Sequence, residues 1–300
     1  MSFDAETATT DWEKDNIILG IDEAGRGPVM GPMVYACAYW KEEYDKDIRK
    51  KFKFNDSKQL TPGDRERMFN QIKAHPNIIR YELIMLPSDY ISKEMLKRQK
   101  VSLNQISQDS AKKLIKTARD KKVNIRKIYV DTVGPAESYQ ILLTKYVNDK
   151  SIEVKVEAKA DAKYECVSAA SIVAKVTRDK EIEIIEKEDK DCGSGYPSDP
   201  KTKEWLKDNY DNVFGYGREV RFSWKTVDNM FKENHNKCEW EDYDSDEERE
   251  KIKNYKKKGK ENEDNKNQKI DYLIVKEESK KKNTIRNFYE KNNIDFNLEL

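Results

Sequence analysis

Four acidic residues stand at the predicted ends of buried strands or in the turns beside them. Asp22 and Glu23 close an apolar run, Asp131 follows the run KIYV, and Asp161 lies in a turn that opens a long helix. Sites in α/β sheets assemble at such strand ends, so we expect the four carboxylates to meet. Carboxylate oxygens suit Mg²⁺, and two such ions about 3.5–4 Å apart can activate water against a phosphodiester. Taken singly, each acid is also a common turn former or helix cap.

A glycine-arginine-glycine turn follows the first two acids. Bare backbone at Gly25 and Gly27 lets a ligand approach N–H and C=O groups, and the guanidinium of Arg26 suits phosphate. Lys58, beside a hydroxyl and just before a predicted helix start, also suits phosphate. Tyr196 stands on a glycine-flanked loop, where its ring either serves a ligand or packs on the core.

A further segment, RFSWK at 221–225, interleaves cations with aromatic rings. Such a pattern is useful against a nucleic-acid backbone, because rings stack and cations neutralise phosphates. The alternative is an amphipathic element whose aromatic side chains point inward.

Composition excludes several classes of protein. The 300 residues are 38% charged and 36% hydrophobic, and no apolar run is long enough to span a membrane. Four cysteines without a CxxC spacing indicate neither a zinc ribbon nor a disulfide framework, and two distant histidines disfavour HExxH and Ser-His-Asp enzymes. Any chemistry therefore falls mainly to carboxylates, lysines and tyrosines, and we expect a reducing compartment.

Hydrophobic periodicity predicts strands that alternate with helices. The expected strands are 16–21, 33–40, 80–86, 127–130 and 152–156, and the expected helices are 61–74, 104–121 and 162–185. The small residues Ser168–Ser171 predict a helix face that packs closely against its neighbour. This order predicts an α/β fold with a mixed sheet flanked by helices.

The net charge of +1 conceals an uneven distribution. Between residues 241 and 300, 31 of 60 residues are charged, whereas the preceding part has an ordinary globular balance. We interpret 241–300 as a charged, partly disordered tail, because it cannot bury enough apolar surface to offset the entropy of ordering. Two apolar islands within it, 272–275 and 285–296, are either fraying ends or segments that fold onto a partner.

Taken together, the motifs resemble those of the type 2 ribonucleases H, and in particular the catalytic A subunit of the eukaryotic enzymes. The resemblance covers roughly residues 17–231. It rests on the segments IDEAGRGPVMGPMVYA, FNDSKQL, SLNQISQD, YVDTVG, KADAKYECVSAASIVAKVTRD, GSGYPSDPKT and VRFSW, which occur in the order found in that family.

The resemblance implies a ribonuclease H-like fold with a helical C-terminal extension, and it assigns roles to individual residues. Metal-binding and catalytic roles fall on Asp22, Glu23, Asp131 and Asp161. Substrate-binding roles fall on Gly25, Arg26, Gly27, Lys58, Asn104 and Tyr196. The implied domains are an N-terminal arm (1–15), a catalytic domain (16–190), an extension carrying the tyrosine loop (191–240) and a partner-binding tail (241–300).

The activity implied by the resemblance is Mg²⁺-dependent, with Mn²⁺ as an alternative. It is cleavage of RNA in RNA–DNA hybrids and incision 5′ of single ribonucleotides in duplex DNA, leaving a 3′-hydroxyl and a 5′-phosphate. The expected setting is a nuclear heterotrimer with accessory subunits B and C. Two rivals remain open: a nuclease of the same fold that acts on DNA, and a non-catalytic hybrid-binding subunit.

Overall fold

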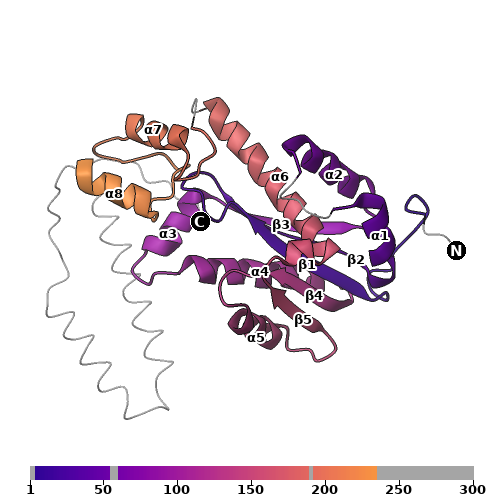
Figure 1. Cartoon of the computed structure of the whole chain (residues 1–300). Coiled ribbons are helices and arrows are strands. Elements are labelled where there is room, and N and C mark those ends of the chain that lie inside the picture. Colours follow the sequence, from indigo (N-terminus) through magenta and orange to yellow (C-terminus); the bar gives the residue numbers. More distant parts are fainter. Residues whose placement is uncertain (1–3, 55–59, 189–191, 235–300) are drawn as a thin grey trace, which may run out of the picture. The chain divides into compact units, whose positions relative to one another are not determined.

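The computed structural model describes residues 4–54, 60–188 and 192–234, which belong to one compact unit (Figure 1). The predicted tail at 241–300 and Lys58 lie outside the described residues. None of the helices in the described ranges has the length and apolar character that a bilayer crossing requires.

A five-stranded mixed sheet forms the centre of the unit. Its strands are β1 (Ile17–Ala24), β2 (Met33–Lys41), β3 (Arg80–Leu86), β4 (Ile125–Asp131) and β5 (Glu153–Glu157), in the spatial order β3-β2-β1-β4-β5. The neighbours β1, β2 and β3 pair antiparallel, whereas β4 pairs parallel with both β1 and β5. The carboxyl ends of β1, β4 and β5 therefore meet at one edge of the sheet.

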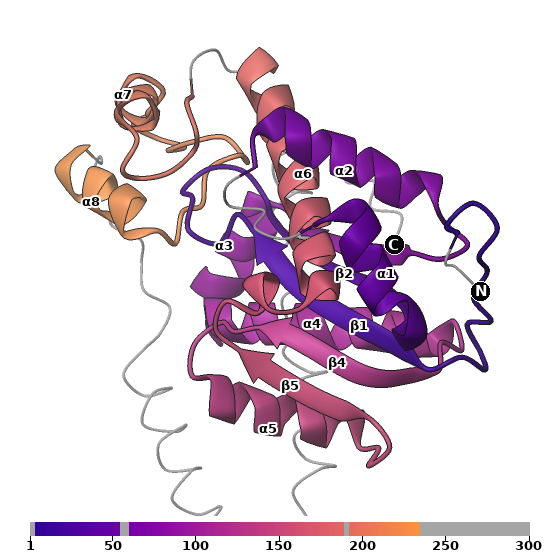
Figure 2. The same ribbon diagram turned by 45° about the vertical axis from the view of Figure 1, so that its right-hand side comes forward.

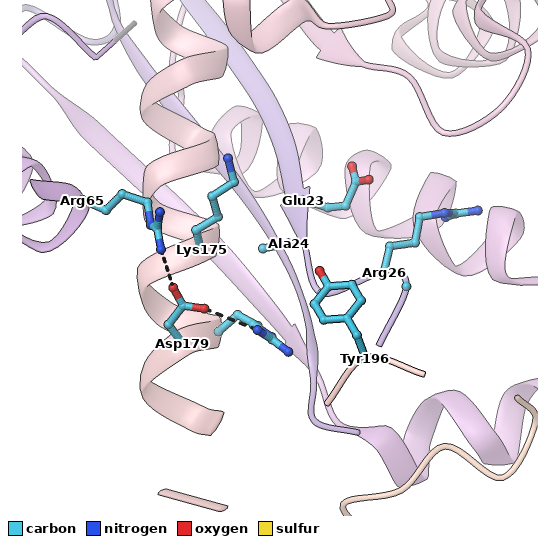
Figure 3. Close-up of a pocket in the computed structure, with 10 residues that line it drawn as sticks. Glu23, Ala24, Arg26, Arg65, Lys175, Asp179 and Tyr196 are labelled. Atoms are coloured by element: carbon cyan, nitrogen blue, oxygen red, sulfur yellow. Dashed lines mark hydrogen bonds and ion pairs between the residues drawn. The ribbon is translucent and has the colours of Figure 1, made fainter. Parts of the chain in front are cut away.

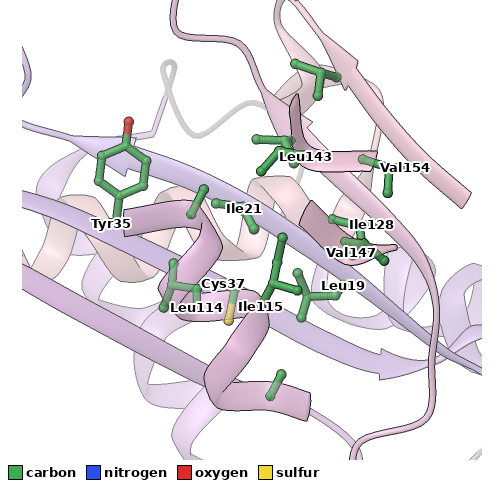
Figure 4. Packing of buried hydrophobic residues seen from close by; sticks show 14 of the residues in the cluster. Leu19, Ile21, Tyr35, Cys37, Leu114, Ile115, Ile128, Leu143, Val147 and Val154 are labelled. Carbon is green, nitrogen blue, oxygen red and sulfur yellow. The ribbon is translucent and has the colours of Figure 1, made fainter. Parts of the chain in front are cut away.

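Helices cover both faces of the sheet (Figure 2). The helices are α1 (Asp45–Phe52), α2 (Pro62–Ala74), α3 (Ser88–Leu96), α4 (Leu103–Asp120), α5 (Ala136–Val147), α6 (Glu165–Glu188), α7 (Pro200–Asp208) and α8 (Lys225–Asn234). Residues of α4 and α5 pack on one face, and residues of α1, α2 and α6 pack on the other. Alternation along β1 makes this possible, because Leu19 and Ile21 point toward α4 and α5 while Ile18 points toward α6 (Figure 4).

Helix α6 lies directly against β1 at Gly20. A Cβ added at Gly20 would stand 2.2 Å from the backbone carbonyl carbon of Cys166 and 2.3 Å from the backbone nitrogen of Val167. Only a glycine leaves room for the helix backbone at this point. The small side chains Ser168–Ser171, all fully buried, continue the close contact along α6, as their size predicts.

A third hydrophobic cluster joins α7 and α8 to the loop between β1 and β2. Val29 and Met30 of that loop pack with Trp205, Leu206 and Val220, all of them buried. Residues Met30 and Val220 also form an isolated β-bridge. The C-terminal extension is thus attached to the segment that follows the Gly25–Gly27 turn.

Most predicted elements occur, with shifted ends. The helix predicted at 61–74 is confirmed as α2, with Thr61 as its N-cap accepting a hydrogen bond from the Asp64 N–H. The helix predicted from residue 162 begins at Glu165, because residues 160–162 form a 3₁₀ turn, η2 (Ala160–Ala162). Strand β1 runs on to Ala24, so Asp22 and Glu23 lie within it. Periodicity did not predict α1, α3, α5, α7 and α8, which are short or flanked by proline; a helical C-terminal extension is expected only from the resemblance.

We expect Gly20→Ala to destabilise the fold by more than about 2 kcal/mol, because its methyl group would require the backbone of α6 to move away from β1. The matched control is Gly63→Ala in α2, where an added Cβ meets nothing within 4 Å and alanine is the better helix former. Urea unfolding followed by circular dichroism measures both. Equal midpoints for the two variants would show that the contact at Gly20 is not tight in solution.

Candidate active site

The structure brings the four predicted acids to one edge of the sheet. Register places Ile21 of β1 opposite Val130 of β4, so the next residues, Asp22 and Asp131, are neighbours on the face covered by α6. Asp161 joins them from the 3₁₀ turn η2 that precedes α6. That turn is tied to β4, because Asp131 Oδ1 accepts a hydrogen bond of 2.9 Å from the Ala160 N–H.

Burial makes this cluster electrostatically unfavourable by itself. Asp22 and Asp161 are each 5% exposed. Burial is the largest reason that the pKa of Asp22 is raised to about 7; a hydrogen bond with Ser171 opposes the rise, and the charge of Asp131 adds to it. Burial likewise raises the pKa of Glu23 to about 8, with further contributions from Asp22 and Asp131. Asp22 and Glu23 therefore resist ionisation until positive charge arrives.

The chemistry of this set fits a hard cation. The Oε2 atom of Glu23 is buried and has no hydrogen-bond partner among the described residues, an arrangement that a cation would satisfy. No three acidic, histidine or cysteine side chains in the described ranges are close enough to enclose an ion without help. An ion held here would therefore share its coordination with waters and phosphate oxygens, as Mg²⁺ commonly does.

The Gly25–Gly27 turn follows Glu23 directly, and its two glycines differ. Gly25 has a φ of 77°, and a Cβ there would also lie 2.5 Å from the Pro32 carbonyl oxygen, so the backbone of the turn requires a glycine at this position. Gly27 is not in the left-handed region, and a Cβ there would make an ordinary contact with the Tyr196 ring at 3.5 Å. A side chain at Gly27 would therefore fit the fold but would occupy part of the space between the turn and Tyr196.

The predicted substrate residues Arg26 and Asn104 are in direct contact. The Arg26 guanidinium donates to Asn104 Oδ1 and to the hydroxyl of Ser107, both on α4. These bonds aim Arg26 toward α4, away from Tyr196 (Figure 3). Asn104 thus orients the arginine of the turn, a function that its sequence position alone did not indicate.

Tyr196 faces the turn from a loop that is fixed at several points. The carbonyl of Gly195 accepts hydrogen bonds from the N–H groups of Val29 and Met30, at 2.8 and 3.2 Å. Arg178 of α6 donates to the Ser194 carbonyl at 2.8 Å, and its guanidinium carbon lies 5.6 Å from the centre of the Tyr196 ring. The ring itself is 41% exposed and therefore accessible to a ligand.

A cavity of about 450 Å³ lies between the turn, Tyr196 and α6 (Figure 3). Its lining residues are Glu23, Ala24, Gly25, Arg26, Gly27, Arg65, Lys175, Arg178, Asp179 and Tyr196. The wall opposite Glu23 carries Arg65, which pairs with Asp179 at 3.2 Å, and Lys175.

Sequence reasoning missed the basic residues of this wall. Helical spacing could have identified them, because Ser171, Lys175 and Arg178 recur at intervals of four and three and so share one face of α6. That face begins at the small residues that pack on β1 and continues into the cavity.

Arg221 corrects an expectation from sequence. It does not reach toward a phosphate but is fully buried, and it donates to the carbonyl oxygens of Gly25 at 2.6 Å, Arg26 at 3.1 Å and Gly31 at 3.0 and 2.8 Å. Its guanidinium carbon lies 4.7 Å from the ring centre of Trp224, whose indole N–H donates to the Gly27 carbonyl at 3.0 Å. The 221–225 segment therefore supports the turn from behind.

The raised pKa of Asp22 predicts a stability that depends on pH. Between about pH 4 and about pH 7, the Asp22 carboxyl keeps its proton in the folded chain but has lost it in the unfolded chain. The free-energy cost of folding with a buried Asp22 carboxyl therefore grows as the pH rises through this range. In EDTA at pH 8, we expect Asp22→Asn to be more stable than the wild type by more than about 1 kcal/mol, and the difference to shrink toward pH 4.

Thermal unfolding across this pH range provides the measurement, with Glu204→Gln at an exposed position of α7 as the matched charge-removal control. A gain that is the same at pH 8 and pH 4 would mean that Asp22 is not held in an unfavourable charged state.

Comparisons with known proteins agree with this architecture. The model of the family described as Ribonuclease HII matches residues 19–227. The A subunit of ribonuclease H2 from Mus musculus is 44% identical over 255 residues, 82% of this chain and 84% of that protein. The crystal structure of the ribonuclease H2 from Pyrococcus horikoshii OT3 has a TM-score of 0.62 at 37% identity, covering 72% of this chain and 98% of that one. Bst-RNase HIII in complex with Mn²⁺ shares the fold, with a TM-score of 0.57 at 18% identity, over 77% of this chain and 72% of that one. The chain belongs to the ribonuclease HII family.

Proposed function

We propose that the four acids and the Gly25–Gly27 turn act together to hydrolyse the phosphodiester 5′ of a ribonucleotide. As a member of its family, the chain is a metal-dependent ribonuclease H hydrolase. It acts on RNA in RNA–DNA hybrids and on ribonucleotides embedded in duplex DNA. The observation that carries the site assignment is that the cavity beside the carboxylates is lined by Glu23, by the Gly25–Gly27 turn and by Tyr196.

The carboxylates of Asp22, Glu23, Asp131 and Asp161 would hold two divalent ions, with Mg²⁺ as the cellular ion and Mn²⁺ as an alternative. Such ions, when bound, supply an activated water and neutralise charge that develops on the phosphate. The protein contributes a rigid arrangement, because three of the acids lie on the paired strands β1 and β4 and the fourth, Asp161, follows Ala160, whose N–H is bonded to Asp131. The unfavourable ionisation of Asp22 supports this assignment, since bound cations would offset the cost of its buried charge.

Ribose recognition is assigned to the two elements that face each other across the cavity. Backbone groups of Gly25 and Gly27 approach the 2′-hydroxyl, which is both a donor and an acceptor and distinguishes RNA from DNA. The Tyr196 ring packs on the sugar beside the scissile phosphate. Positive charge on the opposite wall, at Arg65 and Lys175, attracts the strand that carries the ribose.

Two further assignments rest on the resemblance and on the relatives' names. Lys58, outside the described residues, binds the nucleic-acid backbone, and Asn104 assists it through Arg26. The chain is the catalytic member of a nuclear complex, and two accessory subunits, B and C, complete it. Support comes from the relatives in Mus musculus and Homo sapiens, whose names make each of them the A subunit of a ribonuclease H2.

Asp22→Asn and Asp131→Asn should each lower cleavage of a duplex with one ribonucleotide by more than about 100-fold, a larger loss than a supporting residue of a metal site gives. Binding of the hybrid should persist or tighten, because one negative charge no longer repels the phosphates. The assay is strand cleavage with and without Mg²⁺, together with fluorescence anisotropy for binding. It also separates a DNA nuclease and a non-catalytic binder from the proposed enzyme.

Glu157→Gln is the matched control, since Glu157 stands opposite Asp131 on β5 but pairs with Lys155 at 2.8 Å. It should retain activity. Mg²⁺ should raise the melting temperature of the wild type at pH 8 and leave that of the Asp22→Asn, Asp131→Asn double variant unchanged. Substantial Mg²⁺-dependent turnover by the double variant would contradict the assignment of these ligands.

Tyr196→Ala should reduce kcat/KM for cleavage at a single embedded ribonucleotide more than kcat/KM for cleavage within a long RNA–DNA hybrid. The two losses should differ by about tenfold or more. The ring contacts the sugar of one nucleotide. A long hybrid can bind in many registers that each place a ribose at the site, whereas a single embedded ribonucleotide allows only one, so losing the ring should affect the single ribonucleotide more. Phe214→Ala is the control, because Phe214 is an 82% exposed aromatic residue of the same extension that does not line the cavity at the Gly25–Gly27 turn. Equal losses on the two substrates would assign Tyr196 to general catalysis or folding.

A further inference from the structure

Three buried polar atoms close to the acids have no hydrogen-bond partner among the described residues. They are Oε2 of Glu23 and the hydroxyls of Tyr35 and Tyr139. Each tyrosine is 1% exposed, so neither hydroxyl is in contact with bulk water. A buried polar group without a partner costs free energy, and three such groups in one region of the fold indicate a shared role.

The register of the sheet brings these residues together. Glu23 of β1 is the cross-strand partner of Tyr35 on β2, and directly opposite residues of an antiparallel pair have their side chains on one face. Alternation along β1 puts this face on the side of α4 and α5, opposite to the face of Asp22. Tyr35 lies on that side (Figure 4), in the same hydrophobic cluster as Tyr139 of α5.

Both tyrosines interact electrostatically with the same carboxyl group. Burial is the largest reason that the pKa of each tyrosine is raised, and the charge of Glu23 is the next. The Tyr35 hydroxyl in turn opposes the rise that burial causes in the pKa of Glu23. The two hydroxyls therefore lie near Glu23, and near neutral pH they keep the protons that they would donate.

Glu23 differs from the other two strand acids in how its side chain is held. Asp22 Oδ1 accepts a hydrogen bond of 2.8 Å from the Glu23 N–H, and Asp131 Oδ1 accepts one of 2.9 Å from the Ala160 N–H. The glutamate side chain has one more rotatable bond, and within the described ranges no donor fixes its Oε2 atom. Its orientation toward a ligand therefore needs a further contact.

We propose that Tyr35 and Tyr139 are positioning residues for Glu23: their hydroxyls donate to its ionised carboxylate and fix the direction in which it faces a divalent ion. The proposal rests on the proposed role of Glu23 as a metal ligand. A carboxylate has about four lone-pair sites, so it can accept from both hydroxyls and still bind a cation. Neutral donors suit this task because, unlike lysine or arginine, they leave the negative charge for the metal ion.

Replacing tyrosine by phenylalanine separates this role from a structural one. In EDTA at pH 7 the Tyr35 hydroxyl has no partner, so Tyr35→Phe should leave the free energy of unfolding unchanged or raise it. Loss of a residue that orients a metal ligand typically weakens metal binding by about tenfold or more. We therefore expect Tyr35→Phe to raise the Mg²⁺ concentration for half-maximal cleavage by about tenfold, and excess Mg²⁺ to restore most of kcat. Tyr139→Phe should act in the same direction.

Tyr39→Phe is the matched control. Tyr39 is a buried tyrosine of the same strand and cluster, but its hydroxyl donates to Glu82 at 3.2 Å. Removing this hydroxyl breaks a hydrogen bond, so the variant should lose stability in EDTA while keeping the Mg²⁺ dependence of the wild type. The two substitutions in β2 should thus have opposite signatures.

The rise in melting temperature of the full chain with Mg²⁺ at pH 8 gives a second readout that needs no catalysis. Tyr35→Phe should require about tenfold more Mg²⁺ for the same rise. In a chain that carries Glu23→Gln, Tyr35→Phe should change the Mg²⁺ requirement no further, because the carboxylate that the hydroxyl positions is absent.

Three outcomes would count against these assignments. A wild-type Mg²⁺ dependence in both Tyr35→Phe and Tyr139→Phe would overturn this inference and leave the proposed function standing. An effect of Tyr35→Phe that is equally large in the Glu23→Gln chain would show that the tyrosine acts through another group, and would also overturn it. A wild type whose cleavage and melting temperature do not respond to Mg²⁺ would instead overturn the proposed function on which the inference rests.

Discussion

The contact between helix α6 and strand β1 at Gly20 is the constraint on which both the fold and the site depend. It sets the helix backbone against the strand with no side chain between them. Because the helix lies this close, Ser171 reaches Asp22, and the 3₁₀ turn before α6 delivers Asp161 to the same edge. One turn further along, Lys175 and Arg178 reach the cavity. A wider separation would remove all of these contacts together.

The acidic side chains of the site are available to a ligand, whereas the buried cationic side chain of Arg221 stabilises the neighbouring backbone. Asp22 and Glu23 are buried together with raised pKa values, which is unfavourable for an empty protein and suitable for one that receives cations. Arg221, by contrast, donates its hydrogen bonds to backbone carbonyls of the neighbouring turn and to no acid. The buried positive charge of Arg221 therefore supports the turn and pairs with none of the acids.

The Gly25–Gly27 turn is supported from three directions, and this is why its position is defined. Asn104 holds Arg26 from α4, and Arg178 of α6 fixes the loop that faces it. Arg221 and Trp224 support it from the C-terminal extension. Discrimination by a single hydroxyl needs such a rigid turn, since groups that move would accommodate either sugar.

The sequence by itself determined the five strands, the helices α2, α4 and α6, the cap at Thr61, the α/β class and the resemblance to a family that the comparisons confirm. These are local properties, because periodicity, capping and motifs depend on residues that are close together in the sequence. Only the tertiary structure decided what Arg221 does, because whether a cation meets solvent or a carbonyl depends on residues almost two hundred positions away. The same holds for Lys175. Its place in the cavity arises from packing between distant segments, which no local pattern records.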